Sequence, residues 1–109
     1  MVGKYRVITL CGSTRFKDEF IEWQKKLTLQ GNIVLSVDIF SHSGDNEAMN
    51  DDILAMLDDM HKRKIDVCDE VFVINPGGYI GKSTKSEIEY AERHNKPVRY
   101  LSQIPNLNL

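Results

Sequence analysis

The stretch with the greatest potential for chemistry spans residues 74–91, where a glycine-rich turn leads into a segment that carries a carboxylate, Glu87. Three glycines within five positions allow the backbone to bend sharply or to pass close to a ligand. In a crevice, Glu87 could attack a sugar carbon as a nucleophile or act as a general acid or base. It could instead form a capping box with Thr84 at a helix start, which would make it a structural residue.

The same turn could also bind an anion. Gly81 and Ser83 come between an apolar run at residues 71–74 and a predicted helix over residues 84–94, which Thr84 opens. A strand, a glycine-rich loop and a helix N-terminus in this order present backbone N–H groups and hydroxyls to a ligand in many α/β folds. The turn completes neither the Walker A pattern nor GxGxxG, so ATP and dinucleotide binding have little support.

A second candidate turn follows the first apolar run of the chain. Gly12 permits a tight turn, Ser13 supplies a hydroxyl, and Arg15 can pair with a phosphate or a carboxylate. The alternative is that Ser13 or Thr14 only caps the next helix while Arg15 lies in solvent. The turn by itself leaves these two interpretations equally open.

The elements that must position these residues alternate between strand and helix. Short apolar runs predict strands at residues 5–11, 33–37, 70–74 and 97–101, and helical periodicity predicts helices at residues 16–30, 51–66 and 84–94. This alternation predicts one α/β domain over residues 1–109, a flavodoxin-like three-layer sandwich whose four-stranded parallel sheet has the order 2-1-3-4 and helices on both faces. In that order the carboxyl ends of strands one and three meet, which brings the two candidate turns to one crevice.

Two segments between the turns carry further expectations. The helix over residues 51–66 is expected to align Ile53, Leu57, Met60 and Lys64 on one stripe, while the basic run at residues 61–64 complements the helix dipole. The apolar residues in the segment 38–50 show no clear helical or strand period, which predicts a surface loop that could cover the site. The three histidines show no metal-ligand spacing, so neither a metal nor a cofactor is expected.

The composition of the chain is that of a globular domain without the charge or the apolar runs of nucleic-acid-binding or membrane-spanning proteins. A chain of 109 residues with 41% hydrophobic and 28% charged residues is typical of one globular domain. The net charge of −2 gives no basic field for a nucleic-acid polymer, and no apolar run reaches membrane-spanning length. Cys11 and Cys68 form no CxxC pair, which predicts buried, reduced thiols and a cytoplasmic location.

Several of these segments together resemble a known family. Residues 11–15 (CGSTR) and 81–91 (GKSTKSEIEYA) are similar to the nucleoside 2-deoxyribosyltransferase superfamily, and more closely to its 2′-deoxynucleoside 5′-phosphate N-hydrolase branch. Residues 69–74 and 96–98 fall where that superfamily has its third strand and the entry to its fourth. The resemblance covers most of the chain and implies a homo-oligomer that cleaves the bond between a base and deoxyribose, in which a neighbouring copy completes the site.

The resemblance also implies roles for individual residues. The family's nucleophilic glutamate falls on Glu87, which would attack the anomeric carbon before water or a second base takes over the sugar. Ser13 would help to hold the 5′-phosphate, with Arg15 beside it. Thr9 stands where the family has a tyrosine, and His61 stands near the position of a family aspartate, with Asp58 or Asp59 as the nearest substitutes.

Three functions remain open at this point. The first is cleavage or transfer of a nucleoside or nucleotide N-glycosidic bond, the second a catalytically inactive nucleotide-binding module, and the third a small interaction protein in which Glu87 only caps a helix. The predicted catalytic residues are Glu87, Asp58 and His61. The predicted substrate-binding residues are Thr9, Gly12, Ser13, Arg15, Gly81, Ser83 and Thr84.

Overall fold

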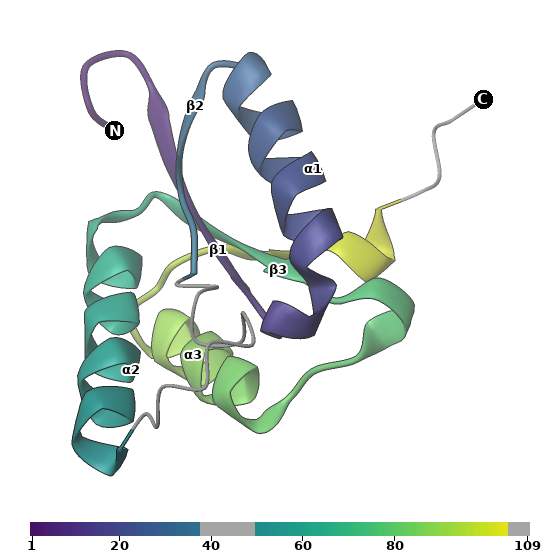
Figure 1. Ribbon diagram of the computed structural model, residues 1–109. Coiled ribbons are helices and arrows are strands. Elements are labelled where there is room, and N and C mark those ends of the chain that lie inside the picture. Colours follow the sequence, from purple (N-terminus) through teal and green to yellow (C-terminus); the bar gives the residue numbers. More distant parts are fainter. Residues whose placement is uncertain (38–49, 105–109) are drawn as a thin grey trace.

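A computed structural model of the chain describes residues 1–37 and 50–104. Its four strands form one parallel sheet in the order β2-β1-β3-β4 (Figure 1). The predicted parallel sheet and its strand order are therefore confirmed. The strands are β1 (Arg6–Gly12), β2 (Asn32–Leu35), β3 (Glu70–Ile74) and β4 (Val98–Tyr100).

In the described residues, three α-helices cover the two faces of the sheet, as the alternating pattern predicts. Helix α1 (Lys17–Leu29) lies on one face, and α2 (Asp51–Val67) and α3 (Lys82–Arg93) lie together on the other (Figure 1). The arrangement is consistent with a flavodoxin-like sandwich. No helix in the described part of the chain is long and apolar enough to cross a membrane.

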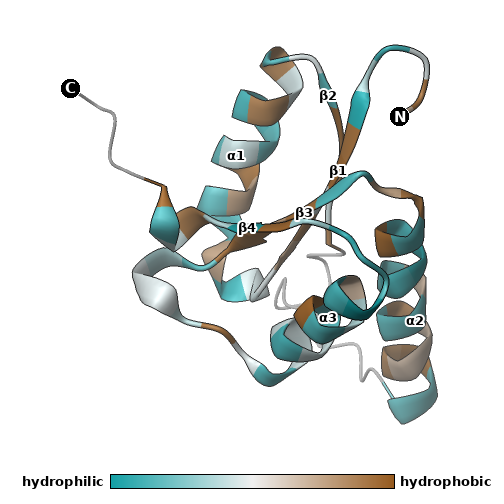
Figure 2. Ribbon diagram, turned by 180° about the vertical axis from the view of Figure 1, so that it is seen from behind, coloured by the Kyte–Doolittle hydropathy of each residue, from teal (hydrophilic) through white to brown (hydrophobic). Residues whose placement is uncertain are grey.

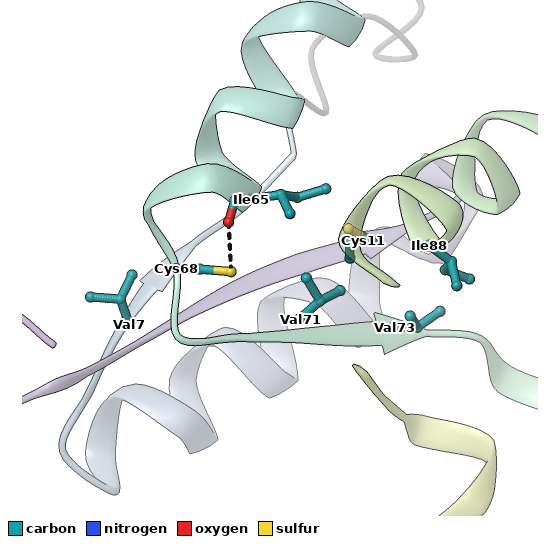
Figure 3. Close-up of a cluster of buried hydrophobic side chains, with 8 residues drawn as sticks. Val7, Cys11, Ile65, Cys68, Val71, Val73 and Ile88 are labelled. Atoms are coloured by element: carbon teal, nitrogen blue, oxygen red, sulfur yellow. Dashed lines mark hydrogen bonds between the residues drawn. The ribbon is translucent and has the colours of Figure 1, made fainter. Parts of the chain in front are cut away.

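The alternation of side chains along β1 divides the core into two clusters. Ile8 and Leu10 face α1, where they pack with Phe20 and Leu27. Val7 and Cys11 face the other way, in the cluster that includes Ile65 of α2 and Ile88 of α3 (Figure 3). Apolar residues accordingly run along the central strands (Figure 2), because β1 and β3 are covered on both faces.

The start of α3 differs from the prediction in a way that matters for Glu87. The helix begins at Lys82 after an extended Gly81, and no side chain of the described residues caps it. Thr84 and Glu87 therefore lie inside the helix, with 3% and 8% of their surfaces exposed. The predicted capping box between them is wrong, because a capping threonine must stand before the first helical residue. Glu87 needs another explanation.

Helix α2 also presents a different face to the protein than its predicted stripe. The helix starts at Asn50, whose side chain accepts a 2.9 Å hydrogen bond from the Ile53 backbone N–H. Ile53 and Met60 are 37% and 42% exposed, whereas His61 is buried together with Ile65, four residues later. The predicted stripe of Ile53, Leu57, Met60 and Lys64 is therefore about one residue away from the buried face of α2, which contains the His61 imidazole. The predicted loop over residues 38–50 falls, apart from Asn50, outside the described residues.

Candidate functional site

A cavity of about 420 Å³ lies where β1 ends and α3 begins, beside α2. Its wall combines the turn after β1, the first turns of α3 and one side of α2, so it draws on three separate stretches of sequence. Both predicted turns contribute to it. The lining residues are Gly12, Ser13, Thr14, Val37, Leu54, Leu57, Asp58, His61, Gly81, Lys82, Ser83, Thr84 and Glu87.

The turn after β1 depends on glycine. Gly12 pairs with Ile74 of β3, and a Cβ at Gly12 would lie 2.6 Å from the Ile74 carbonyl oxygen. Its φ of +153° adds backbone strain for any side chain. The turn that follows, Thr14–Phe16, is a short 3₁₀ segment in which Ser13 Oγ accepts a 3.3 Å hydrogen bond from the Arg15 N–H. Glycine thus lets β1 run tightly beside β3 up to the cavity.

Thr14 stands out among the residues of this turn. Its hydroxyl oxygen is buried and has no hydrogen-bond partner within the described part of the chain. Because Thr14 lines the cavity, its hydroxyl could bind a polar group of a ligand there. Arg15 is placed differently: it is exposed, it does not line the cavity, and its guanidinium lies 4.2 Å from the centre of the Tyr79 ring.

The N-terminus of α3 forms the other polar part of the wall. Lys82, Ser83 and Thr84 open the helix, and no side chain occupies the capping position at Gly81. The N–H groups of a first helical turn have no partner inside the helix and carry partial positive charge. Together with the Lys82 ammonium and the hydroxyls, they favour an anionic ligand at this end of the cavity.

Glu87 lies on the same face of α3, four residues after Ser83, and is buried against β1 and α2. Burial, with a smaller contribution from the negative charge of Asp58, raises the pKa of its carboxyl group from 4.5 to about 7. A hydrogen bond from the Cys11 thiol and the charge of Lys62 act in the opposite direction. Both protonation states are therefore accessible near neutral pH, so the carboxyl group can act as a nucleophile or as an acid or base.

Cys11, His61 and Glu87 meet at the inner end of the cavity, each from a different element. Cys11 Sγ lies 3.4 Å from His61 Nε2, and His61 Nε2 lies 3.8 Å from Glu87 Oε1. One ligand atom from each residue lies within 4.8 Å of the other two, a spacing that could hold a metal ion. Burial raises the pKa of the Cys11 thiol well above its usual range, and the nearby Glu87 carboxylate adds to this effect.

No protein-family model matches this chain, and no curated protein matches it. The case for a function therefore depends on the geometry of the cavity.

The cavity brings together most of the predicted site. Thr9 and Arg15 are the exceptions: Thr9 is fully buried, and its hydroxyl donates a 2.9 Å hydrogen bond to the Lys64 carbonyl oxygen. Asp58 lines the cavity and forms a 2.9 Å ion pair with Lys62. The predicted residues in the wall are Gly12, Ser13, Asp58, His61, Gly81, Ser83, Thr84 and Glu87.

Sequence reasoning did not assign Thr14, Lys82 or Cys11 to the site. Cys11 could have been found from strand alternation: it lies two residues after Thr9, on the face of β1 that α2 and α3 cover, and directly before the glycine of the turn. Thr14 was considered only as a helix cap. The apolar part of the wall, from Val37, Leu54 and Leu57, carried no chemical signal in the sequence.

Proposed function

We propose that this protein is an N-glycosidase that releases the base from a 2′-deoxynucleoside 5′-monophosphate, with Glu87 as its nucleophile. One observation carries the proposal: a buried carboxylate and the N-terminus of α3 share the wall of one cavity. The step from Gly81 to Glu87 rises about 9 Å along the helix axis, a span comparable to a sugar with its phosphate. A substrate phosphate at the start of α3 would therefore place the sugar beside Glu87.

The proposed phosphate subsite consists of the first turn of α3 and the turn after β1. The N-terminal N–H groups of α3 and the Lys82 ammonium supply positive charge, and Ser13 and Thr14 supply hydroxyls. The unpartnered hydroxyl of Thr14 supports this assignment, because a phosphate oxygen would accept its hydrogen bond. The apolar part of the wall, with Leu54 and Leu57, is suited to the base or to the sugar face.

The proposed chemistry has two steps. An oxygen of the ionised Glu87 carboxylate attacks the anomeric carbon and forms an ester bond, while the C–N glycosidic bond breaks and its electron pair leaves on the base nitrogen. His61, which lines the cavity, is the candidate that protonates the leaving base, whereas Asp58 lines the cavity as a carboxylate paired with Lys62. A water molecule then hydrolyses the ester, or a second base accepts the sugar, which would make the reaction a transfer.

The decisive experiment incubates the protein with a panel of deoxynucleoside monophosphates and the matching nucleosides, in the presence of a chelator, and detects free base by chromatography. We expect base release by the parent protein and none by Glu87→Gln, which should still bind the nucleotide. Glu89→Gln is the matched control, because Glu89 lies on the same helix but is exposed. Undiminished release by Glu87→Gln would overturn the proposal, and binding without release by the parent would favour an inactive nucleotide-binding module.

The phosphate subsite has a separate test in which binding is measured by calorimetry. A monophosphate should bind more tightly than its nucleoside, and Thr14→Val should weaken monophosphate binding about tenfold, as the loss of one hydrogen bond does. Thr28→Val is the control, because the Thr28 hydroxyl is bonded to the Gln24 carbonyl on α1. Equal affinities for the monophosphate and the nucleoside would remove the phosphate from the proposal.

A further inference from the structure

The trio of Cys11, His61 and Glu87 suggests a second use of the same cavity. The three side chains come from the end of β1, from the middle of α2 and from the second turn of α3, and less than a tenth of each residue's surface is exposed. They are far apart in sequence, so only the fold brings them together. We propose that they bind one Zn²⁺ ion, with His61 and Glu87 facing the cavity.

The spacing of the three ligand atoms supports this assignment. Zn²⁺ binds thiolate sulfur at about 2.3 Å and imidazole nitrogen or carboxylate oxygen at about 2.0–2.2 Å, so ligand atoms around a tetrahedral ion lie about 3.3–3.6 Å apart. Here Sγ and Nε2 are 3.4 Å apart, Nε2 and Oε1 are 3.8 Å apart, and no pair in the trio exceeds 4.8 Å. Binding therefore requires side-chain rotations that bring the three ligand atoms closer together.

The kinds of ligand select the metal. A thiolate and an imidazole favour zinc over magnesium or calcium, which prefer a shell of oxygen atoms. Thiolate and carboxylate together carry two negative charges, which neutralise the charge of the ion in a buried place. Binding displaces the proton of the thiol, which leaves to the solvent as the S–Zn bond forms.

Three protein ligands leave a fourth tetrahedral position, as in open zinc sites. His61 and Glu87 line the cavity whereas Cys11 lies behind them, so the fourth position faces the cavity and would hold a water molecule or an anion. In the proposed function, the carboxylate of Glu87 must be free to attack the sugar. Zinc and the glycosyl intermediate therefore compete for one carboxylate, and zinc should inhibit base release.

The metal site is tested by binding, without any substrate. Full-length protein is stripped with a chelator, and Zn²⁺ is titrated in competition with a chromophoric chelator. We expect one ion per chain with a Kd in the micromolar range or below. Co²⁺ should bind at the same place and produce the near-ultraviolet charge-transfer absorption of a cobalt–thiolate bond.

The variants make the assignment specific. Cys11→Ser should abolish the charge-transfer band, whereas Cys68→Ser should retain it, because Cys68 is not one of the three ligands and its thiol donates to the Ile65 carbonyl oxygen (Figure 3). Glu87→Gln and His61→Gln should each weaken zinc binding at least tenfold, and His94→Gln, at an exposed position, should not. The two glutamine variants keep the test informative if Cys11→Ser does not fold.

Two results would overturn the metal site: no zinc binding below about 100 µM, or binding that Glu87→Gln and His61→Gln leave unchanged. The failure of the proposed function is distinguishable, because base release is measured in chelator and zinc binding is measured without nucleotide. Zinc binding by a protein that releases no base would establish the metal site alone. The competition for Glu87 has its own test, in which zinc is added in excess of the chelator until the free concentration saturates the binding titration. If base release is not reduced under these conditions, the competition is refuted.

Discussion

Replacing Glu87 with glutamine should stabilise the metal-free protein at neutral and higher pH. The pKa of Glu87 is raised from 4.5 to about 7, mainly by burial, and each pKa unit corresponds to about 1.36 kcal/mol. Ionising Glu87 therefore costs the folded state up to about 3 kcal/mol. Glutamine has nearly the same shape and remains neutral, so it avoids this cost while its carbonyl oxygen can still accept the hydrogen bond from Cys11.

The sign of the pH dependence follows from the direction of the shift. The folded state holds the Glu87 proton more tightly than the unfolded chain, so its contribution to stability is complete below pH 4.5 and is lost as the pH rises through about 7. We expect the free energies of unfolding of parent and Glu87→Gln to be similar near pH 4.5. The variant should become more stable by up to about 3 kcal/mol near pH 8.

The assay is urea unfolding followed by circular dichroism at several pH values, with EDTA present throughout. The groups that face Glu87 are Cys11 from β1 and Asp58, His61 and Lys62 from α2. All four remain in the variant, so most of their own titration cancels in the difference. Repeating the comparison in a His61→Gln background separates the carboxylate from the imidazole. Parallel stability curves for parent and variant between pH 5 and pH 8 would refute the burial of an ionisable Glu87.

Two other predictions concern the turn after β1 and the outer face of α2. Gly12→Ala should destabilise the protein by about 1–3 kcal/mol in urea unfolding, because the added Cβ would meet the Ile74 carbonyl oxygen. Gly3→Ala also places a side chain at a positive φ, +59°, but no described residue lies within 4 Å of the added Cβ, so it should cost less. An equal loss would contradict the steric reasoning. We also expect light scattering to show at least a homodimer, because Met56 and Met60 are exposed on α2 and could pack against a second copy. Met56→Lys should shift the equilibrium from dimer toward monomer. A parent that is monomeric at high micromolar concentration would contradict this.

The architecture could be predicted from the sequence because strands and helices are indicated by local patterns of residues. Apolar runs and glycine punctuation predict the strands well: residues 70–74 are β3 without change. The start of α3 was misplaced, because Thr84 and Glu87 have the spacing of a capping box, and only the backbone at Gly81 reveals that the helix begins earlier. The spacing of Thr84 and Glu87 fits both a capping box and a site residue inside the helix, and only the position of the first helical residue distinguishes the two.

The candidate site was predictable only in part, because its residues become neighbours through packing. In the strand order 2-1-3-4, which the sequence indicates, β1 and β3 are parallel neighbours, so the turns after them lie at the same edge of the sheet. The burial of His61 depends on how α2 is rotated against the sheet, and a rotation of about one residue decides whether an imidazole or Met60 faces inward. The contact of Cys11 with that imidazole is a consequence of the same rotation.

The two-sided core described for β1 has a consequence for protein engineering. Ile8 and Leu10 face α1, whereas Cys11 faces the site. Neighbouring residues of one strand therefore pack in two separate clusters, and mutations in one cluster should have little effect on the other. Substitutions in α1, such as changes at Leu27, should combine additively with changes at Glu87, because sites without shared contacts rarely couple. A library restricted to the α1 face could therefore raise thermal tolerance while the cavity on the opposite face is left unchanged.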